Sequence, residues 1–397
     1  MMGGEDRGAA RTGRTLVRVI ESDAEFASLE GAWEKLQAGA AVTSVFASFD
    51  WQYLWWKAYG RGRPLRLLVA TSDGEVVGIL PLYVCTERIL GCPVRLLRFV
   101  GTGGDTSPDD LGPVLAAGRE AEAARALAAA VLCLGGWDVL HLHDMEPATA
   151  FAAEMRAAAR RASLPSRAGR SQRISHLALP ESWDAWLLSL HRDRRYRVKK
   201  MRRDLVAAHP EARFFVWTEA ATLEAGVDRL IHLHHQRWQG TGQAHGFSSP
   251  EYVGFHRAVM AACLARDRLR LHCLELRGEI AAMLYMYRFR DAIYLMQAGF
   301  DPEYARSRPG LVLLGWVIEQ AIAEKVRVLD FLKGEHRYKD ELATGERETV
   351  YLTALRMRPG AWVFGARRLV LPAIKGYLAQ ALGRAPRTDR QPGPAAV

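Results

Sequence analysis

Cysteine is scarce in this sequence and follows no metal-binding or redox pattern. The 397 residues include five cysteines, and no two of them form a Cys-x-x-Cys pair. We therefore predict buried, reduced thiols in a cytosolic protein. His232, His234 and His235 point to different faces of a helix and have no carboxylate or cysteine at ligand spacing. The sequence accordingly predicts no metal site.

Long hydrophobic runs are also missing. The N-terminus has no apolar stretch that fits a signal peptide, and the best apolar run, Leu127–Leu140, is too short to cross a bilayer. A later stretch, Trp362–Leu382, is interrupted by three basic residues and a proline. Such a segment either packs on its own domain or lies on an anionic membrane surface. We predict a cytoplasmic protein, with the inner face of the membrane as the alternative location.

The common nucleotide-binding loops are absent, whereas positive charge is abundant. No GxxxxGK[ST] loop occurs in the chain, which argues against a P-loop fold. The net charge is +10, and residues 190–203 hold eight Lys or Arg against one Asp. This segment lacks Gly and Pro and is predicted to be a helix with Arg195 and Lys199 on one face. Tyr196 is its one aromatic residue, so a solvated face, an anionic substrate or a membrane surface is favoured over nucleic acid.

The sequence contains a divergent internal repeat. Residues 66–84 and residues 270–288 each read as two apolar strands joined at a Gly-Glu pair, with the turn signals Asp73-Gly74 and Arg277-Gly278. In both copies a short strand, a loop, an Ala/Leu-rich helix and a closing buried strand follow. The predicted helices are residues 119–134 and 311–325, and the predicted closing strands are 137–144 and 326–334.

This order predicts an α/β protein with two similar domains, each with a mixed central sheet flanked by helices. We place the first domain at residues 14–170 and the second at residues 171–360. A flexible tail, residues 1–13, precedes them. A basic amphipathic segment with a disordered tail, residues 361–397, follows them.

Two equivalent loops of the repeat carry opposite charges. Arg306, Arg308 and Gly310 stand before a helix N-terminus, whose N–H groups and positive dipole end suit a pyrophosphate. The loop of the first copy carries Asp109 and Asp110 and no basic residue, so it suits a cationic or hydroxyl-rich acceptor. Each loop also has a simpler interpretation: a solvated loop in the second copy and a capped turn in the first.

Several pieces of the second copy carry a resemblance to a known superfamily. They are the basic segment, the QRW triplet at 236–238, the Gly278-Glu279 hairpin, the ARSRPG loop at 305–310 and the stretch LDFLKGEHRYKDEL at 329–342. With these pieces the chain resembles the GNAT acetyltransferases, and among them the CelD/BcsL group associated with cellulose biosynthesis. The last stretch is also similar to the closing strand and lysine of the FemABX aminoacyltransferases, which pair two GNAT-like domains. The resemblance covers roughly residues 15–360 and implies tandem GNAT-like domains.

The resemblance implies a donor site for acetyl-CoA. The pantetheine arm would pair with a splayed strand edge, where backbone N–H groups polarise the thioester carbonyl. The implied donor-binding residues are Gln297, Ala298, Gly299, Phe300, Arg306, Arg308 and Gly310.

Catalytic and acceptor-binding residues are implied as well. Lys339 matches the FemABX lysine and would stabilise the oxyanion or bind the donor phosphates. Asp330 and His336 are the acid–base candidates, with a structural role for Asp330 in a buried strand as the alternative. The residues expected at the acceptor are Asp109, Asp110, Arg237 and Trp238.

The leading hypothesis is an acyl-CoA-dependent N-acyltransferase that acts on a sugar, an amino sugar or an envelope or exopolysaccharide precursor. Its partner would then be a small-molecule or glycan-precursor acceptor. A FemABX-like aminoacyltransferase that takes its donor from charged tRNA is the first alternative. A non-catalytic GNAT fold that binds at the membrane surface is the second. We also predict that the acidic loop of copy one and Lys339 of copy two face a single cleft between the domains.

Overall fold

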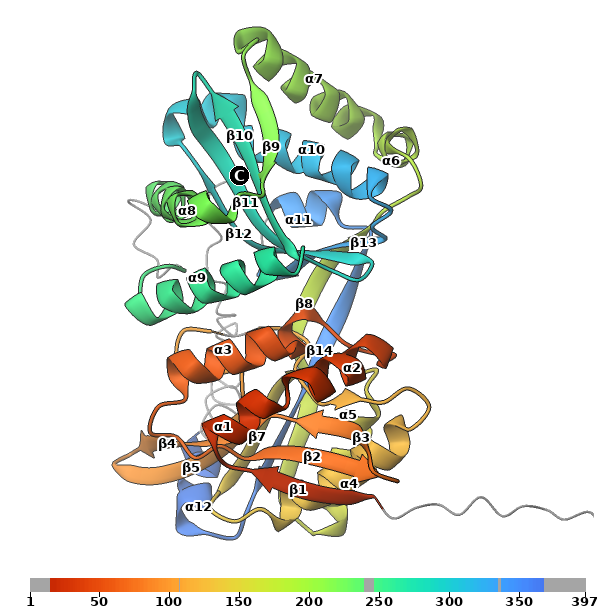
Figure 1. Cartoon of the computed structure of the whole chain (residues 1–397), viewed down its shortest axis with the longest axis vertical. Helices are drawn as coiled ribbons and strands as arrows, with labels where there is room; N and C mark the ends of the chain where they lie inside the picture. The colour runs from red at the N-terminus through yellow and green to blue at the C-terminus, as the bar shows by residue number, and fades with distance from the viewer. Residues whose placement is uncertain (1–14, 107, 239–245, 335–336, 368–397) are drawn as a thin grey trace, which may run out of the picture.

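The computed structural model describes residues 15–106, 108–238, 246–334 and 337–367. Elements of the first copy form the lower half of the molecule in Figure 1, and most elements of the second copy form the upper half. The last helix, α12 (Pro359–Gly365), lies in the lower half, where it packs on β5 (Cys92–Phe99). Strands of both halves form one large sheet with helices on its faces, and the first half has a second, smaller sheet. The two long strands β8 (Ser166–Ala178) and β14 (Gly345–Leu355) run from one half to the other. The predicted fold class, an α/β protein with mixed sheets flanked by helices in two similar halves, is confirmed.

The first half contains eight strands and the helices between them. Its strands are β1 (Leu16–Ile20), β2 (Leu67–Ser72), β3 (Glu75–Leu80), β4 (Leu82–Ile89), β5 (Cys92–Phe99), β6 (Val114–Leu115), β7 (Val139–Met145) and β8 (Ser166–Ala178). Its helices are α1 (Asp23–Ser28), α2 (Glu30–Gly39), η1 (Val45–Ala47), α3 (Phe49–Tyr59), α4 (Glu120–Cys133) and α5 (Ala150–Arg161).

The second half repeats this order and ends with a short helix. Its strands are β9 (Arg213–Trp217), β10 (Leu269–Leu276), β11 (Glu279–Phe289), β12 (Ala292–Phe300), β13 (Val328–Lys333) and β14 (Gly345–Leu355). Its helices are α6 (Trp183–Ser189), α7 (Arg192–Ala208), η2 (Ala220–Thr222), α8 (Leu223–Trp238), α9 (Pro250–Ala265), η3 (Pro302–Ser307), α10 (Pro309–Ala323), α11 (Arg337–Leu342) and α12 (Pro359–Gly365).

The two predicted hairpin turns are present. Asp73 and Gly74 have φ angles of 53° and 80°, and Arg277 and Gly278 have φ angles of 54° and 79°. Two consecutive left-handed residues make the turn whose twist matches antiparallel strands, and glycine takes this conformation without steric cost. Both predicted hairpins of the repeat therefore turn at the predicted residues.

The two halves exchange their last strands. The ten-stranded sheet has the order β4-β5-β7-β14-β8-β13-β12-β11-β10-β9, and the strands β1-β2-β3-β6 form a separate sheet. Thus β14 of the second half pairs with β7 of the first, and β8 of the first half pairs with β13 of the second. The two exchanged strands also pair antiparallel with each other. This arrangement joins the halves through a continuous backbone ladder.

Each half has a point where two parallel strands part. β12 and β13 pair only at Ala292–Val328, Ile293–Leu329 and Tyr294–Asp330. In the first half, β5 and β7 pair only at Leu96–Val139 and Leu97–Leu140. The strand ends beyond these pairs diverge, so each half has the splayed pair of strands that the resemblance implies.

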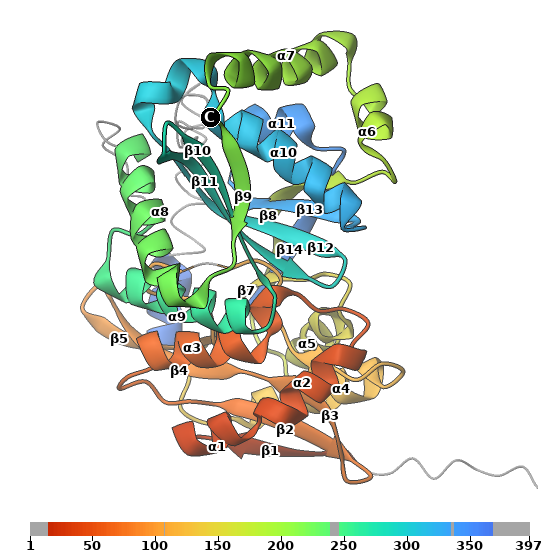
Figure 2. The ribbon, with the colours of Figure 1, turned by 45° about the horizontal axis from the view of Figure 1, so that its top comes forward.

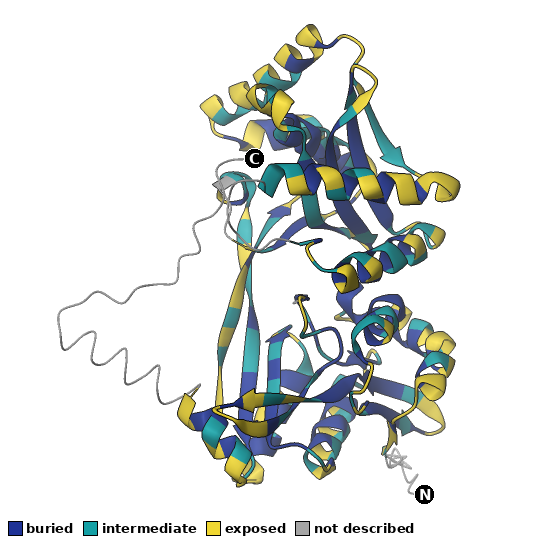
Figure 3. Cartoon of the chain, turned by 90° about the vertical axis from the view of Figure 1, so that its left-hand side faces the viewer, coloured by how far each residue is buried: buried dark blue, intermediate teal, exposed yellow. Residues whose placement is uncertain are grey.

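The hydrophobic core continues from one half into the other. One cluster of buried side chains joins the first-half helices to α8 and α9, and a second cluster joins α6, α7 and α10 to the opposite face of the second-half sheet. Trp51 of α3 lies edge-on to Phe255 of α9 with ring centroids 5.0 Å apart, and Figure 2 shows α9 lying across α3. Burial follows the same layers in Figure 3, where most strands are buried, the long strands β8 and β14 are partly exposed, and the outer helix faces are exposed.

Two sequence-based expectations differ from the structure, and a third lies largely outside the described residues. Each copy ends not with its predicted buried strand but with a further helix and a long strand, so the predicted boundary at residue 170 falls inside β8. The thiols are not all buried, because Cys92 and Cys133 are exposed, whereas Cys263 and Cys273 are buried. The predicted tail 1–13 and most of the segment 361–397 lie outside the described residues.

Candidate functional site: a cavity between the two halves

The splayed strands of the first half are closed by their own acidic loop. Leu111 donates its backbone N–H to Asp144 O at 2.8 Å and forms a parallel bridge with Met145 at the end of β7. The chain therefore occupies the gap between β5 and β7, where a donor would otherwise bind. In the second half, by contrast, the ends of β12 and β13 open to a cavity of ligand size.

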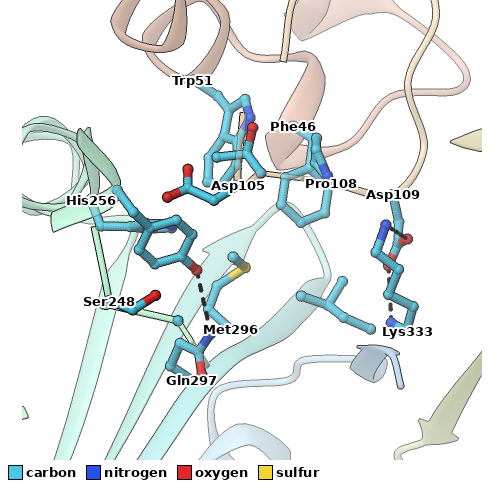
Figure 4. A pocket seen from close by; sticks show the side chains of 14 residues that line it. Phe46, Trp51, Asp105, Pro108, Asp109, Ser248, His256, Met296, Gln297 and Lys333 are labelled. Atoms are coloured by element: carbon cyan, nitrogen blue, oxygen red, sulfur yellow. Dashed lines mark hydrogen bonds and ion pairs between the residues drawn. The ribbon is translucent and has the colours of Figure 1, made fainter. Parts of the chain in front are cut away.

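That cavity lies between the two halves and has a volume of about 450 Å³. Figure 4 shows side chains of α3 and the acidic loop on one side and of α9, β12 and β13 on the other. The residues lining it are Phe46, Trp51, Asp105, Thr106, Pro108, Asp109, Gly246, Ser248, Tyr252, His256, Met296, Gln297, Leu332 and Lys333. The volume is within the range of small-molecule sites, which commonly form at domain interfaces.

Asp109 connects the acidic loop to the end of β13. Its Oδ2 accepts the Lys333 backbone N–H at 3.1 Å, and its Oδ1 lies 3.6 Å from Lys333 Nζ. Figure 4 shows these two side chains facing each other at one end of the cavity. Asp109 is 1% exposed, and this burial raises the pKa of its carboxyl to about 6, although Lys333 opposes the rise. A buried carboxylate with such a pKa can exchange a proton near neutral pH.

Lys339 lies directly behind the end of β13. Its Nζ donates to the Leu332 and Lys333 carbonyl oxygens at 3.0 Å each. The side chain is 4% exposed, and burial lowers the pKa of its ammonium to about 8, with Asp109 and Asp330 opposing the fall. The acidic loop of copy one and the lysine of copy two thus flank the same strand end.

Asp330 and Arg347 hold this strand end in place. Asp330 Oδ1 accepts the Leu332 backbone N–H at 2.7 Å, where Leu332 has a left-handed φ of 55°. Arg347 of β14 donates to Asp330 Oδ2 at 2.8 Å from Nη2 and to both oxygens of Asp110. These contacts favour a positioning role for Asp330 over a direct catalytic one, and they make Asp110 an ion-pair partner of Arg347.

The predicted donor strand is approached closely by α8. A Cβ on Gly299 would lie 2.7 Å from the His234 backbone N, so glycine permits this contact between β12 and α8. The Ala298 carbonyl oxygen accepts from Arg237 Nη1 at 3.3 Å, and His234 Nδ1 lies at the same distance. Burial lowers the pKa of Arg237, and no carboxylate pairs with it among the described residues. Its guanidinium lies 5.9 Å from the Trp238 ring.

A basic groove lies on the opposite face of the second-half sheet, between α7 and α10. The groove has a volume of about 350 Å³, and a pocket of about 50 Å³ adjoins it beside the α10 N-terminus. The pocket is lined by Arg194 and Arg197 of α7, Arg308, and Tyr338 of α11. Arg308, with a left-handed φ of 49°, turns the chain from η3 into α10. Arg306 is exposed and Gly310 is buried in the first turn of α10.

The structure brings together five of the residues that the sequence singled out. Gln297 and Asp109 line the cavity, while Lys339, Asp330 and Asp110 lie just behind it. Phe300 is at the far end of β12, where it pairs with Ala282, and His336 lies outside the described residues. Arg237 and Trp238 are on α8 and do not line the cavity.

Sequence reasoning missed several residues of this site. Lys333 follows the buried run of β13 directly, and an ionisable residue at such a strand end is a signal that was available. Trp51 lies on α3 and His256 on α9, and nothing in the spacing of these two residues distinguishes a cavity wall from a core. Arg347 lies on β14, which the sequence analysis did not predict.

Among the described residues, no three His, Cys, Asp or Glu side chains lie close enough together to hold a metal ion. No helix in the same part of the chain has the length and apolar character to cross a membrane.

Comparison with known proteins identifies the class of the second half. Residues 192–340 match the model of the family described as "Acetyltransferase (GNAT) domain". This match lies within the second half and spans less than half of the chain. No curated protein sequence matches the chain at a significant level.

Solved structures share the fold of both halves. The crystal structure of FemX superposes with a TM-score of 0.57 at 9% identity, over 85% of this chain and 96% of that one. The C-terminal domain of a putative lysylphosphatidylglycerol synthetase from Agrobacterium fabrum has a TM-score of 0.52 at 10% identity, covering 88% and 98%. L-PGS from Bacillus licheniformis has a TM-score of 0.50 at 12% identity, covering 89% and 97%. At these identities the similarity establishes the fold alone.

Proposed function

We propose that the protein is an acyl-CoA-dependent N-acyltransferase that transfers an acetyl group to a primary amine. One observation carries the proposal: the open strands β12 and β13 of the GNAT domain end at a cavity whose opposite wall, with a buried carboxylate, comes from the first half. A donor held on β12 and an amine held at Asp109 would meet there. Such alignment of two reactants supplies a large part of a catalysed rate.

The donor would bind on the groove side of the sheet. Its pyrophosphate would lie at the α10 N-terminus, where Arg306 and Arg308 have no carboxylate partner among the described residues. Arg197 of α7 lines the same pocket as Arg308, so positive charge comes from two elements. The pantetheine arm would then run along β12 to Gln297, Ala298 and Gly299, with the thioester at the cavity.

The chemical step would use groups from both halves. The amine nitrogen attacks the thioester carbonyl carbon, a C–N bond forms, and the C–S bond breaks to release CoA. The proton lost by the amine passes to the Asp109 carboxylate, whose pKa of about 6 leaves it ionised at neutral pH. The charge of Lys339 stabilises the oxyanion formed on the carbonyl oxygen.

Calorimetry with acetyl-CoA tests the donor site. Replacing Arg306 and Arg308 by alanine should weaken binding by about 2–4 kcal/mol, since each lost charge-assisted hydrogen bond is worth about 1.5–3 kcal/mol and such losses are not additive. The variant Arg277→Ala, which removes an exposed arginine from a hairpin turn, is the matched control. Unchanged affinity in the double variant would overturn the donor site.

A FemABX-like aminoacyltransferase is the second candidate, and the surface of α7 favours it. Arg192, Arg195, Arg197 and Lys199 have no acidic partner among the described residues, so the helix can neutralise several phosphates. Binding of aminoacyl-tRNA that weakens steeply with salt, together with no binding of acetyl-CoA, would establish this alternative.

The finer sequence-based predictions belong to the same proposal. Membership of the CelD/BcsL group and an acceptor from envelope or exopolysaccharide synthesis rest on the resemblance alone. A location at the inner face of the membrane rests on the basic segment 361–397. Co-sedimentation with anionic vesicles is the direct test of that location.

A further inference from the structure

The walls of the cavity between the halves carry more negative than positive charge. Asp105 and Asp109 are its two carboxylates, and Lys333 is its one lysine or arginine among the described lining residues. Lys333 Nζ lies 3.6 Å from Asp109 Oδ1 and 3.4 Å from Asp144 Oδ2, so two carboxylates already offset its charge. His256 is fully buried, and burial lowers its pKa to about 3, which keeps the ring neutral. An anionic ligand would therefore be repelled from this cavity.

Two buried polar atoms of the walls have no hydrogen-bond partner among the described residues. They are Oδ1 of Asp109, an acceptor, and Nε1 of Trp51, a donor. Both residues line the cavity, and their exposures are 1% and 2%. Buried polar groups in native proteins are nearly always paired. A ligand that brings one N–H donor and one oxygen acceptor would satisfy both atoms.

The remaining wall is largely aromatic. Phe46, Trp51, Tyr252 and His256 line the cavity together with the polar side chains of Thr106, Ser248 and Gln297. Trp51 is fixed in this wall, because its ring lies 4.9 Å from Phe46 and 5.8 Å from His256. Figure 4 shows Asp105 between Trp51 and His256. Flat apolar faces bordered by hydrogen-bonding groups suit a compact ring that carries hydroxyl groups.

We propose that the cavity selects an amino sugar that carries neither phosphate nor carboxylate. The amine would donate to Asp109 Oδ1, which has an ion-pair contact but no hydrogen bond within the described part of the chain. A hydroxyl oxygen would accept from Trp51 Nε1, and the ring would lie against the aromatic wall. Asp105 at the rim, already accepting from Tyr59 Oη at 2.6 Å and from Ser249, repels anionic substituents. The inference rests on the proposed N-acyl transfer for the fate of the amine, but not for the binding itself.

Binding without acetyl-CoA tests this selection. Calorimetry or ligand-observed NMR should detect glucosamine, whereas glucosamine 6-phosphate should bind at least about tenfold more weakly. Asp105→Asn should reduce that discrimination several-fold, and the exposed Asp184→Asn on α6 should not change it. Trp51→Phe keeps an aromatic ring but removes the N–H. It should therefore weaken the binding of glucosamine more than the binding of propylamine, which has no hydroxyl group.

The outcomes separate this inference from the proposed function. The proposed selection would be overturned if glucosamine 6-phosphate bound as tightly as glucosamine or more tightly. It would also be overturned if Trp51→Phe lost the same affinity for glucosamine and for propylamine. Acetyl-CoA binding with no binding of either sugar would overturn it too, while the donor site stands. Selective binding of glucosamine with no acetyl-CoA binding would support it while refuting the proposed transfer.

Discussion

Replacing Lys339 by methionine removes a buried charge while keeping most of the side-chain volume. The native ammonium is 4% exposed and is held by two backbone carbonyl groups at the end of β13. If Lys339 serves catalysis, its removal should abolish turnover without unfolding the protein. If it serves only structure, stability should fall with activity.

The structure gives the size of the stability terms. Burial lowers the pKa of Lys339 from 10.5 to about 8, and at about 1.4 kcal/mol for each pH unit this costs the folded state about 3 kcal/mol at neutral pH. The methionine variant also loses the two hydrogen bonds of Lys339, and this loss lowers its free energy of unfolding by about 1–3 kcal/mol. Because these two terms offset each other, the free energy of unfolding of Lys339→Met should differ from that of the native protein by less than about 2 kcal/mol at pH 7. Its turnover should fall by at least about 100-fold.

The pH dependence provides an independent check on the same residue. Between pH 8 and pH 10.5 the unfolded chain still binds a proton at Lys339 that the folded protein has released. Unfolding then takes up a proton, so the stability contributed by this group rises with pH across that window. From pH 8 to pH 9.5 the native protein should gain about 2 kcal/mol relative to Lys339→Met.

Urea unfolding followed by tryptophan fluorescence measures this gain, and release of the CoA thiol measures turnover. Both proteins are compared at each pH, so that groups common to both cancel. Parallel stability profiles for the two proteins would show that Lys339 has an ordinary pKa. A loss of more than about 5 kcal/mol at pH 7 would show that the lysine is structural.

Three further outcomes follow from the site. Activity should fall below about pH 6, because Asp109 is then protonated. Asp109→Asn should be slow at every pH and should not show this fall. If the variant showed the same fall, Asp109 would be excluded as the base. Arg347→Gln leaves Asp110 and Asp330 without their shared cation and should destabilise the fold by about 3–5 kcal/mol in urea unfolding; a loss under about 1 kcal/mol would contradict this. Changing Arg195 and Lys199 to glutamate should leave thermal unfolding unchanged and weaken binding of tRNA or anionic vesicles at low salt; a large fall in melting temperature would show that α7 is structural.

The repeat could be predicted because its signals are local. Asp73-Gly74 and Arg277-Gly278 lie in turns whose φ angles favour glycine, and the flanking strands are continuous apolar runs. The helices α4 and α10 were predicted within about two residues of their observed ends for the same reason. Local chemistry was therefore enough to define the framework of both halves.

The strand exchange could not be predicted in this way. β8 has the sequence SRAGRSQRISHLA, and most of its residues are at least partly exposed, so no apolar alternation marks it as a strand. Its partners, β13 and β14, lie more than 100 residues away in the sequence. Pairing over such a separation depends on tertiary packing that a local pattern does not contain.

The candidate site was predicted in part for a related reason. Charge marked Asp109 and Asp110 in the loop of the first copy, whereas Lys339 was implied only by the resemblance to the FemABX proteins. Trp51 and His256 are on packing helices, and only the contact between α3 and α9 turns them toward a common cavity. The cavity wall forms only when the two halves pack together, so the sequence of one copy alone does not predict it.

The unequal use of two similar halves has a physical explanation in the acidic loop. In the first half, Leu111 pairs with the end of β7 and fills the gap where a donor would bind. The same closure directs the preceding residues away from their own sheet, so that Asp109 reaches the Lys333 backbone of the second half. Arg347, on the exchanged strand β14, then binds Asp110 and Asp330 together. Closing one donor site and building the acceptor wall of the other are therefore consequences of a single loop conformation.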